Sequence, residues 1–203
     1  DIFHCRLRLV DAFGETTDLS STCNEYEDIF DYMWNRVIKK RNQMITEFMF
    51  KTTALLDIGG FYSMPAGWSS DDITCCLLAR NKGIVFVNEV LCNWRESGDN
   101  ISSSHDYYYP KMLAIYKYKL WIHQFLVSLE EKGAENLFYK ELKLKAYSEI
   151  EIGLRETAAR FIFYAKPLRI FKNLHICRSE FDITPWSIIG VLLESYGKRL
   201  KTR

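Results

Sequence analysis

Two adjacent carboxylates, Asp71 and Asp72, are the side chains whose types and spacing best suit acid–base chemistry. Ser69 and Asp72 have the spacing of an N-terminal capping pair, so both acids are expected in the first turn of a helix. There, one carboxylate can act as a general base while the other orients a hydroxyl group. Acidic residues in a first turn also stabilise a helix by up to about 1 kcal/mol. From the spacing alone, this stabilising role is the simpler interpretation.

Three further features near the acids could contact a ligand. Gly59 and Gly60 let the backbone approach a bound molecule closely, although a helix C-cap followed by a turn explains the same pair. Trp68 is expected just before the helix, where its ring could stack on a sugar or pack in the core. Arg95 ends a predicted strand and could bind phosphate oxygens, although Glu96 beside it offers a weak surface ion pair instead.

The first elements that position these residues follow from hydrophobic periodicity. Residues 2–11 alternate apolar and polar side chains, which predicts a half-buried strand. Thr22 and Glu25 fit a capping box, and the apolar stripe from Tyr26 to Ile38 predicts a helix after Thr22. The basic run Lys39-Lys40-Arg41 is expected at the solvated C-terminal end of that helix, where the helix dipole favours positive charge.

Short strands and helices are expected to alternate from there to Arg95. The predicted elements are a strand over residues 42–50, a helix over 51–58 ended by Gly59, a helix over 69–82 ended by Gly83, and two strands over 84–87 and 90–94 joined by a tight turn. The second half is predicted to be mostly helical. Its elements are a long helix after Pro110, one or two helices over 135–165 with a division near Gly153, and a last helix capped by Asp182 or Thr184.

Composition excludes some functions. The 203 residues carry 27 basic and 26 acidic side chains, and a net charge of +1 argues against a general nucleic-acid-binding surface. The six cysteines form no Cys-x-x-Cys pair and show no metal-ligand spacing, which is typical of small buried residues in a reducing compartment. No apolar run has the length of a membrane span.

The order of these motifs resembles the second half of inverting family 2 glycosyltransferases, which have a GT-A fold. The matching segments are Gly59-Gly60-Phe61, Gly67-Trp68, Asp71-Asp72, Trp94-Arg95 and the serines at 102–104, within about the first half of the chain. Many family members have Glu where this chain has Asp71. The resemblance implies an α/β fold: a partial GT-A mixed sheet with flanking helices over residues 1–104, the C-terminal portion of a catalytic domain, and a mostly α-helical extension over residues 105–203.

The resemblance also implies a mechanism. Asp72 would deprotonate an acceptor hydroxyl, whose oxygen attacks the anomeric carbon of a nucleotide-activated sugar and displaces the diphosphate with inversion. Asp71 would support or orient the reacting groups. The substrate-binding residues would be Gly59, Gly60, Trp68 and Arg95, with Arg95 near the leaving diphosphate.

The family's nucleotide-binding βαβ units and its Asp-x-Asp metal motif have no counterpart in this sequence, which begins inside a strand without Met. We therefore expect a fragment that is inactive by itself. The Mn²⁺ or Mg²⁺ of the complete enzyme would be held by ligands outside this chain.

The expected partners are a nucleotide-sugar donor and a glycan or lipid-linked acceptor in surface polysaccharide synthesis, without nucleic acid. A cytoplasmic location is expected, and the helical half with its basic tail from Lys198 to Arg203 could contact the inner face of the cell membrane or self-associate. Two non-enzymatic alternatives stay open: an interaction or oligomerisation module, and a degenerate transferase remnant that binds a glycan without turning it over.

Overall fold

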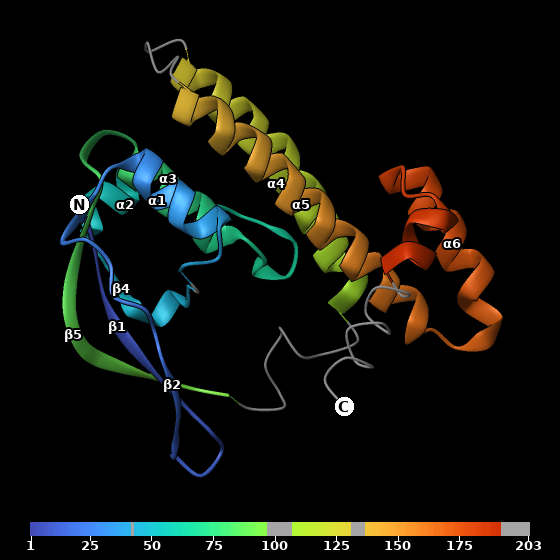
Figure 1. Cartoon of the computed structure of the whole chain (residues 1–203), viewed down its shortest axis with the longest axis horizontal. Helices are drawn as coiled ribbons and strands as arrows, with labels where there is room; N and C mark the ends of the chain where they lie inside the picture. Colours follow the sequence, from blue (N-terminus) through green and yellow to red (C-terminus); the bar gives the residue numbers. More distant parts are fainter. Residues whose placement is uncertain (42, 97–106, 131–136, 192–203) are drawn as a thin grey trace.

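The computed structural model describes residues 1–41, 43–96, 107–130 and 137–191, and the strands within them form one mixed, curled sheet (Figure 1). These strands are β1 (Ile2–Val10), β2 (Thr16–Leu19), β3 (Tyr26–Glu27), β4 (Phe48–Phe50) and β5 (Ile84–Arg95). One edge of β1 runs parallel to β5, and the other pairs antiparallel with β2 and β4. β3 adds antiparallel to β5, which gives the order β2-β1-β5-β3 with β4 beside β1.

Helices cover the sheet and extend well beyond it. They are α1 (Ile29–Val37), α2 (Thr52–Asp57), α3 (Ser70–Lys82), α4 (Tyr108–Glu130), α5 (Leu137–Phe163) and α6 (Ile170–Phe181), with 3₁₀ turns η1 (Ile45–Glu47), η2 (Pro65–Gly67) and η4 (Pro167–Arg169). In Figure 1, α1 and α3 lie between the sheet and the long α4–α5 pair, and α6 lies at one end of that pair. No helix in the described ranges is both long and apolar enough to cross a lipid bilayer.

Two hydrophobic clusters hold these layers together. The first joins the sheet to α1, α3, α4 and α5 through buried residues that include Ile2, Tyr32 and Leu142. The second joins α4 and α5 to α6, and its buried residues include Leu154 and Cys177. Because burial of apolar surface is the dominant favourable term in folding, the helical half is held to the sheet by a shared core.

The α/β class and the mostly helical second half are confirmed. The first strand lies where its alternation predicted it, α2 ends just before Gly59, and α3 begins at Ser70 and is ended by Gly83. α5 is a single helix that continues through Gly153, as one of the two alternatives predicted. These elements depend on local periodicity and on glycine stops, which the sequence displays directly.

Two predictions are wrong because strand pairing overrides the structure that the local sequence favours. They concern the start of α1 and the two strands expected after Gly83. α1 begins at Ile29, since Tyr26 and Glu27 pair with β5 and Asp28 provides the N-cap by accepting hydrogen bonds from two backbone N–H groups. The two predicted strands after Gly83 form one strand, β5, because its pairing with β1 continues across two irregularities in register.

Other predictions fail in detail. In the predicted strand over residues 42–50, Phe48–Phe50 are the only described residues that form a strand and η1 precedes them, while position 42 lies outside the described residues. Ser69 has φ of 61° and its side chain makes no capping hydrogen bond. α6 was not predicted. A helix is present over 185–191, and Thr184 accepts a hydrogen bond from the Ser187 N–H as its predicted cap.

A substitution at Gly83 tests the junction between α3 and β5. Gly83 has φ of 64° and ψ of −164°, a region that is essentially restricted to glycine. A Cβ there would lie 2.3 Å from the Glu27 backbone oxygen and 2.7 Å from the Tyr26 ring. Gly83→Ala is therefore expected to lower the free energy of unfolding, measured by chemical denaturation, by at least about 2 kcal/mol.

Gly14→Ala is the matched control. Gly14 has φ of 91°, but a Cβ there would meet nothing within 4 Å, so only backbone strain is added. Equal losses in the free energy of unfolding of the two variants would show that the close approach of β3 to Gly83 does not add to the cost of the Gly83→Ala substitution.

Candidate functional site

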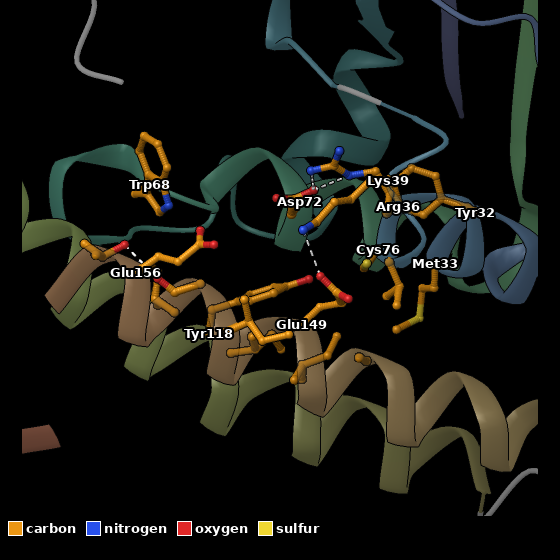
Figure 2. A pocket seen from close by; sticks show the side chains of 18 of the residues that line it. Tyr32, Met33, Arg36, Lys39, Trp68, Asp72, Cys76, Tyr118, Glu149 and Glu156 are labelled. Atoms are coloured by element: carbon orange, nitrogen blue, oxygen red, sulfur yellow. Dashed lines mark hydrogen bonds and ion pairs between the residues drawn. The ribbon is translucent and has the colours of Figure 1, made fainter. Parts of the chain in front are cut away.

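A cavity of about 420 Å³ lies between the helices α1 and α3 on one side and the α4–α5 pair on the other (Figure 2). Its volume lies within the range of about 300–1,000 Å³ that is typical of small-molecule pockets. Much of its wall is apolar, with Met33 and Cys76 on the α1–α3 side and Ile122 and Ile150 on the α4–α5 side. An apolar wall with a few polar groups is the usual composition of a ligand site.

Asp72 faces this cavity from the first turn of α3, and Arg36 in the last turn of α1 binds its carboxylate. Arg36 Nε donates to Asp72 Oδ1 at 2.8 Å, and Arg36 Nη2 lies 2.7 Å from the same oxygen. Burial opposes the charge of Arg36, but its interactions with Asp72, Tyr32 and Tyr118 together hold the pKa of Arg36 above its usual value. Because both contacts use Oδ1, Arg36 leaves Oδ2 of Asp72 for another partner.

A second ion pair crosses from the end of α1 to α5. Lys39 Nζ lies 2.9 Å from Glu149 Oε2, and Figure 2 shows the Lys39 side chain reaching past Asp72 towards Glu149. The hydrogen bond to Glu149 raises the pKa of Lys39. Lys145, one helical turn before Glu149, lies 2.9 Å from its Oε1. The two ion pairs therefore place alternating charges along one part of the wall, and Glu156 and Arg160 on α5 add two more charged residues to the lining.

Trp68 lines the cavity in a segment of unusual backbone. Lys111 Nζ on α4 lies 5.0 Å from the centre of its ring, a cation–π contact that helps to fix the indole. Of the four non-glycine residues with positive φ in the described ranges, Ala66 and Ser69 flank Trp68, and Lys39 lines the cavity. Such conformations cost about 1–3 kcal/mol each and cluster at ligand-binding sites.

Only two of the residues predicted to act on substrates meet at this cavity. Asp72 and Trp68 line it, whereas Asp71, Gly59, Gly60 and Arg95 are not among its lining residues. Gly59 and Gly60 have φ of 85° and 86° and donate hydrogen bonds back to the last turn of α2, which fits the C-cap interpretation. Burial, and then the charge of Asp72, raise the pKa of Asp71. Arg95 is exposed at the end of β5, and the serines at 102–104 lie outside the described residues.

Several cavity residues carry no local sequence signal. Arg36 pairs with Asp72 across 36 positions of sequence, and Lys39 pairs with Glu149 on a different helix. Tyr118 on α4 also lines the cavity, although its position resembles any other aromatic in an apolar helix. These residues become recognisable only when helices from both halves of the chain are brought together.

The prediction that the basic run after α1 is solvated is wrong for Arg41. Arg41 is buried, and its Nη2 lies 2.6 Å from Oε2 of the buried Glu27 on β3. Asn35 Nδ2 donates to the other Glu27 oxygen at 2.7 Å. This ion pair satisfies the charge of Glu27 within the protein, as a buried carboxylate requires.

Next to this pair lie two more buried titratable groups, His4 and Glu47. Together with Arg41 they line a gap of about 10 Å³, roughly the space of one water molecule. Within the described residues, His4 Nε2 and Glu47 Oε1 have no hydrogen-bond partner. Burial lowers the pKa of His4 to about 3 and raises the pKa of Glu47 to about 7, so the fold favours the neutral form of both side chains.

No site for a divalent metal is found. Across the described ranges, no group of three or more His, Cys, Asp or Glu side chains could hold a metal ion. The described residues therefore provide no candidate ligand set, and the Mn²⁺ or Mg²⁺ that the family resemblance implies, with ligands outside this chain, stays a prediction.

Comparison with known proteins gives no match: no protein-family model, no curated protein and no solved structure is significantly similar to this chain. A function must therefore be argued from the geometry of the cavity and from the residues that line it.

The pKa of Glu47 gives a prediction about stability. Because burial raises this pKa from 4.5 to about 7, the folded protein holds a proton that the unfolded chain releases between those values. The corresponding stabilisation is complete below about pH 4.5 and is lost as the pH rises through about 7. Glu47→Gln remains neutral, so the variant is expected to gain on the order of 3 kcal/mol relative to wild type between pH 4.5 and pH 8.

Urea denaturation of the two proteins at both pH values measures this gain, and the comparison cancels the titration of shared groups such as His4. Glu15→Gln, at an exposed position, is the control and should show no such gain. If the free energy of unfolding differed between Glu47→Gln and wild type by the same amount at both pH values, the raised pKa of Glu47 would be contradicted.

Proposed function

We propose that this chain forms the acceptor side of an inverting glycosyltransferase in which Asp72 is the base. The observation that supports the proposal most directly is the Asp72 carboxylate in the wall of a 420 Å³ cavity that Trp68 also lines. The left-handed backbone at Ala66, Ser69 and Lys39 adds support, because strained conformations tend to persist where a site must be preorganised. The proposed setting is surface polysaccharide synthesis on the cytoplasmic side of the membrane, which the family resemblance implies.

In the proposed step, an acceptor hydroxyl donates a hydrogen bond to Asp72 Oδ2 while Arg36 holds Oδ1. The hydroxyl oxygen attacks the anomeric carbon of the donor sugar as its proton moves to Asp72. The bond between the anomeric carbon and the diphosphate oxygen breaks, and its electron pair leaves with the nucleoside diphosphate. Attack from the opposite face inverts the anomeric centre. Arg36 acts as a positioning residue, since it fixes the direction of the carboxylate.

The composition of the cavity favours an acceptor with an apolar part. The cavity is lined by charged residues and by aliphatic and aromatic side chains. The charged residues are Arg36, Lys39, Asp72, Glu149, Glu156 and Arg160, and the apolar part includes Ile122, Ile150 and Tyr118. A polar glycan could bind the charged groups, but only an acceptor with an alkyl or prenyl chain would also bury apolar surface against the aliphatic and aromatic part of the wall, worth about 25 cal/mol per Å². We therefore favour a lipid-linked acceptor, with the sugar hydroxyl at Asp72 and the apolar portion between α1 and the α4–α5 pair.

The donor side is proposed to lie in a part of the protein outside this chain. The nucleotide and the divalent ion that neutralises the leaving diphosphate would be bound there. Arg95 lies outside the cavity lining, so its proposed contact with the diphosphate depends on that part as well. Activity is accordingly tested in the complete protein, and acceptor binding in this chain.

Asp72→Asn in the complete protein tests the role of the base. The amide cannot accept the proton, so kcat is expected to fall by about 10²–10⁴-fold while donor binding stays unchanged. Transfer assays measure kcat, and calorimetric titration with UDP or GDP and Mn²⁺ measures donor binding. Asp31→Asn is the matched control, because Asp31 is also a first-turn acid but belongs to α1 and does not line the cavity. Turnover at the wild-type rate in Asp72→Asn would rule out Asp72 as the base, whereas a complete wild-type protein without any turnover would support a remnant or an interaction module.

Substitutions at Gly153 test the cavity as the acceptor site. Gly153 lines the cavity from the middle of α5, and a Cβ there would meet nothing within 4 Å. Gly153→Phe should fill the space and weaken binding of an alkyl glycoside to the isolated chain at least tenfold, as measured by calorimetry. Gly153→Ala should keep binding and stabilise the fold by up to about 1 kcal/mol, because alanine favours a helix. Unchanged binding in Gly153→Phe would place the acceptor elsewhere.

A further inference from the structure

Large apolar side chains are exposed where α5 turns into α6. Leu168 is 98% exposed, Phe171 83% and Phe163 69%. They lie within ten residues of sequence, at the end of α5, in η4 and at the start of α6. Scattered exposed apolar residues are normal, whereas exposed apolar residues that gather in one segment suit an interaction surface. We call residues 163–172 the α5–α6 corner.

The charges around the α5–α6 corner all have one sign. No Asp or Glu occurs from residue 157 to 179, whereas this stretch contains five cations: Arg160, Lys166, Arg169, Lys172 and Arg178. The three cations inside the corner are exposed, as are Leu168 and Phe171 between them. Because the chain as a whole has a net charge of only +1, this concentration of positive charge is a local feature.

The exposed apolar residues of the corner are not part of the hydrophobic core that anchors α6. α6 is anchored through its other face, where Cys177 and Phe181 are buried in the second cluster. Asn173 Nδ2 also donates to the Phe161 backbone oxygen at 3.1 Å. With α6 fixed in this way, Leu168 and Phe171 face solvent. Figure 1 shows α6 at the opposite side of the molecule from the sheet.

We propose that the α5–α6 corner binds the surface of an anionic lipid bilayer. Leu168, Phe171 and Phe163 would enter the boundary between headgroups and acyl chains, as the apolar side chains of interfacial helices do. The cations would remain at headgroup level, where each Lys or Arg strengthens binding to an anionic surface by about fivefold. Long basic side chains can lay their aliphatic stems along the apolar surface while their charges stay in water.

The corner begins close in sequence to a residue that lines the cavity. Arg160 lines the cavity and Phe163 lies three residues further along α5, a rise of about 4.5 Å. Binding of the corner would hold this end of the cavity near the lipid surface. The proposal does not depend on sugar transfer, because it requires only the exposed residues and their charges.

Co-sedimentation with vesicles of known composition tests the proposal. The chain should bind vesicles of phosphatidylglycerol mixed with an equal part of phosphatidylcholine, bind phosphatidylcholine alone much more weakly, and lose affinity as salt rises. Arg169→Glu with Lys172→Glu should weaken binding at least about 25-fold. Leu168→Ser with Phe171→Ser should weaken it at least about tenfold.

Matched variants control for general effects of charge and exposed surface. Lys117→Glu with Lys140→Glu changes two exposed lysines of α4 and α5, and Leu144→Ser changes a residue that is exposed in the middle of α5. Both should bind vesicles as wild type does. Because all substituted side chains are exposed, every variant is expected to keep the wild-type circular dichroism spectrum and melting temperature.

Three results would overturn the proposal. One is a wild-type chain that does not bind anionic vesicles at low salt. Another is equal loss of binding in the corner variants and in their controls. The third concerns the basic tail from Lys198 to Arg203, which lies outside the described residues: loss of binding in Lys198→Glu with Arg199→Glu, but not in the corner variants, would assign the contact to the tail.

Discussion

The contact between Arg36 and Asp72 holds the two helices of one cavity wall together. Arg36 donates to Asp72 Oδ1 in the first turn of α3 and, through Nη1, to the Arg41 backbone oxygen at 2.7 Å. Hydrogen bonds between charged groups are about twice as strong as neutral ones, so this contact limits how far α1 and α3 can move apart. It also sets the direction of the carboxylate, and a ligand at Asp72 therefore meets a group that is already oriented.

Arg36 also connects the cavity to the sheet. The Arg41 backbone binds Arg36, while the Arg41 side chain binds Glu27 on β3, which pairs with β5. A buried ion pair adds little net stability, but removing one partner costs about 3–5 kcal/mol because the other charge stays buried. We interpret the pair of Arg41 and Glu27 as a fixed attachment for the segment after α1. This segment contains Lys39, the residue that reaches across to α5.

The helical half completes the cavity and is part of the same core as the sheet. α4 and α5 supply one wall, with Ile122, Ile150 and Glu149 facing the helices that pack on the sheet. A long helix such as α5 can take part in two surfaces, because its residues near Glu149 face the cavity while its end carries the exposed α5–α6 corner. Because α5 is one continuous helix, a ligand bound at the corner would also limit the movement of the cavity wall.

The sequence by itself determined the elements that depend on neighbouring residues. Alternation predicted β1, glycine stops set the ends of α2 and α3, and the acid pair was correctly expected in the first turn of α3. Only the tertiary structure decided which of these residues share a site. It placed Asp72, Arg36 and Trp68 at one cavity and left Arg95 outside its lining. It also buried Arg41 and made β5 a single strand. The reason is physical: periodicity, caps and glycine stops act within a few residues, whereas ion pairs, strand pairing and cavities depend on which distant segments the core brings into contact.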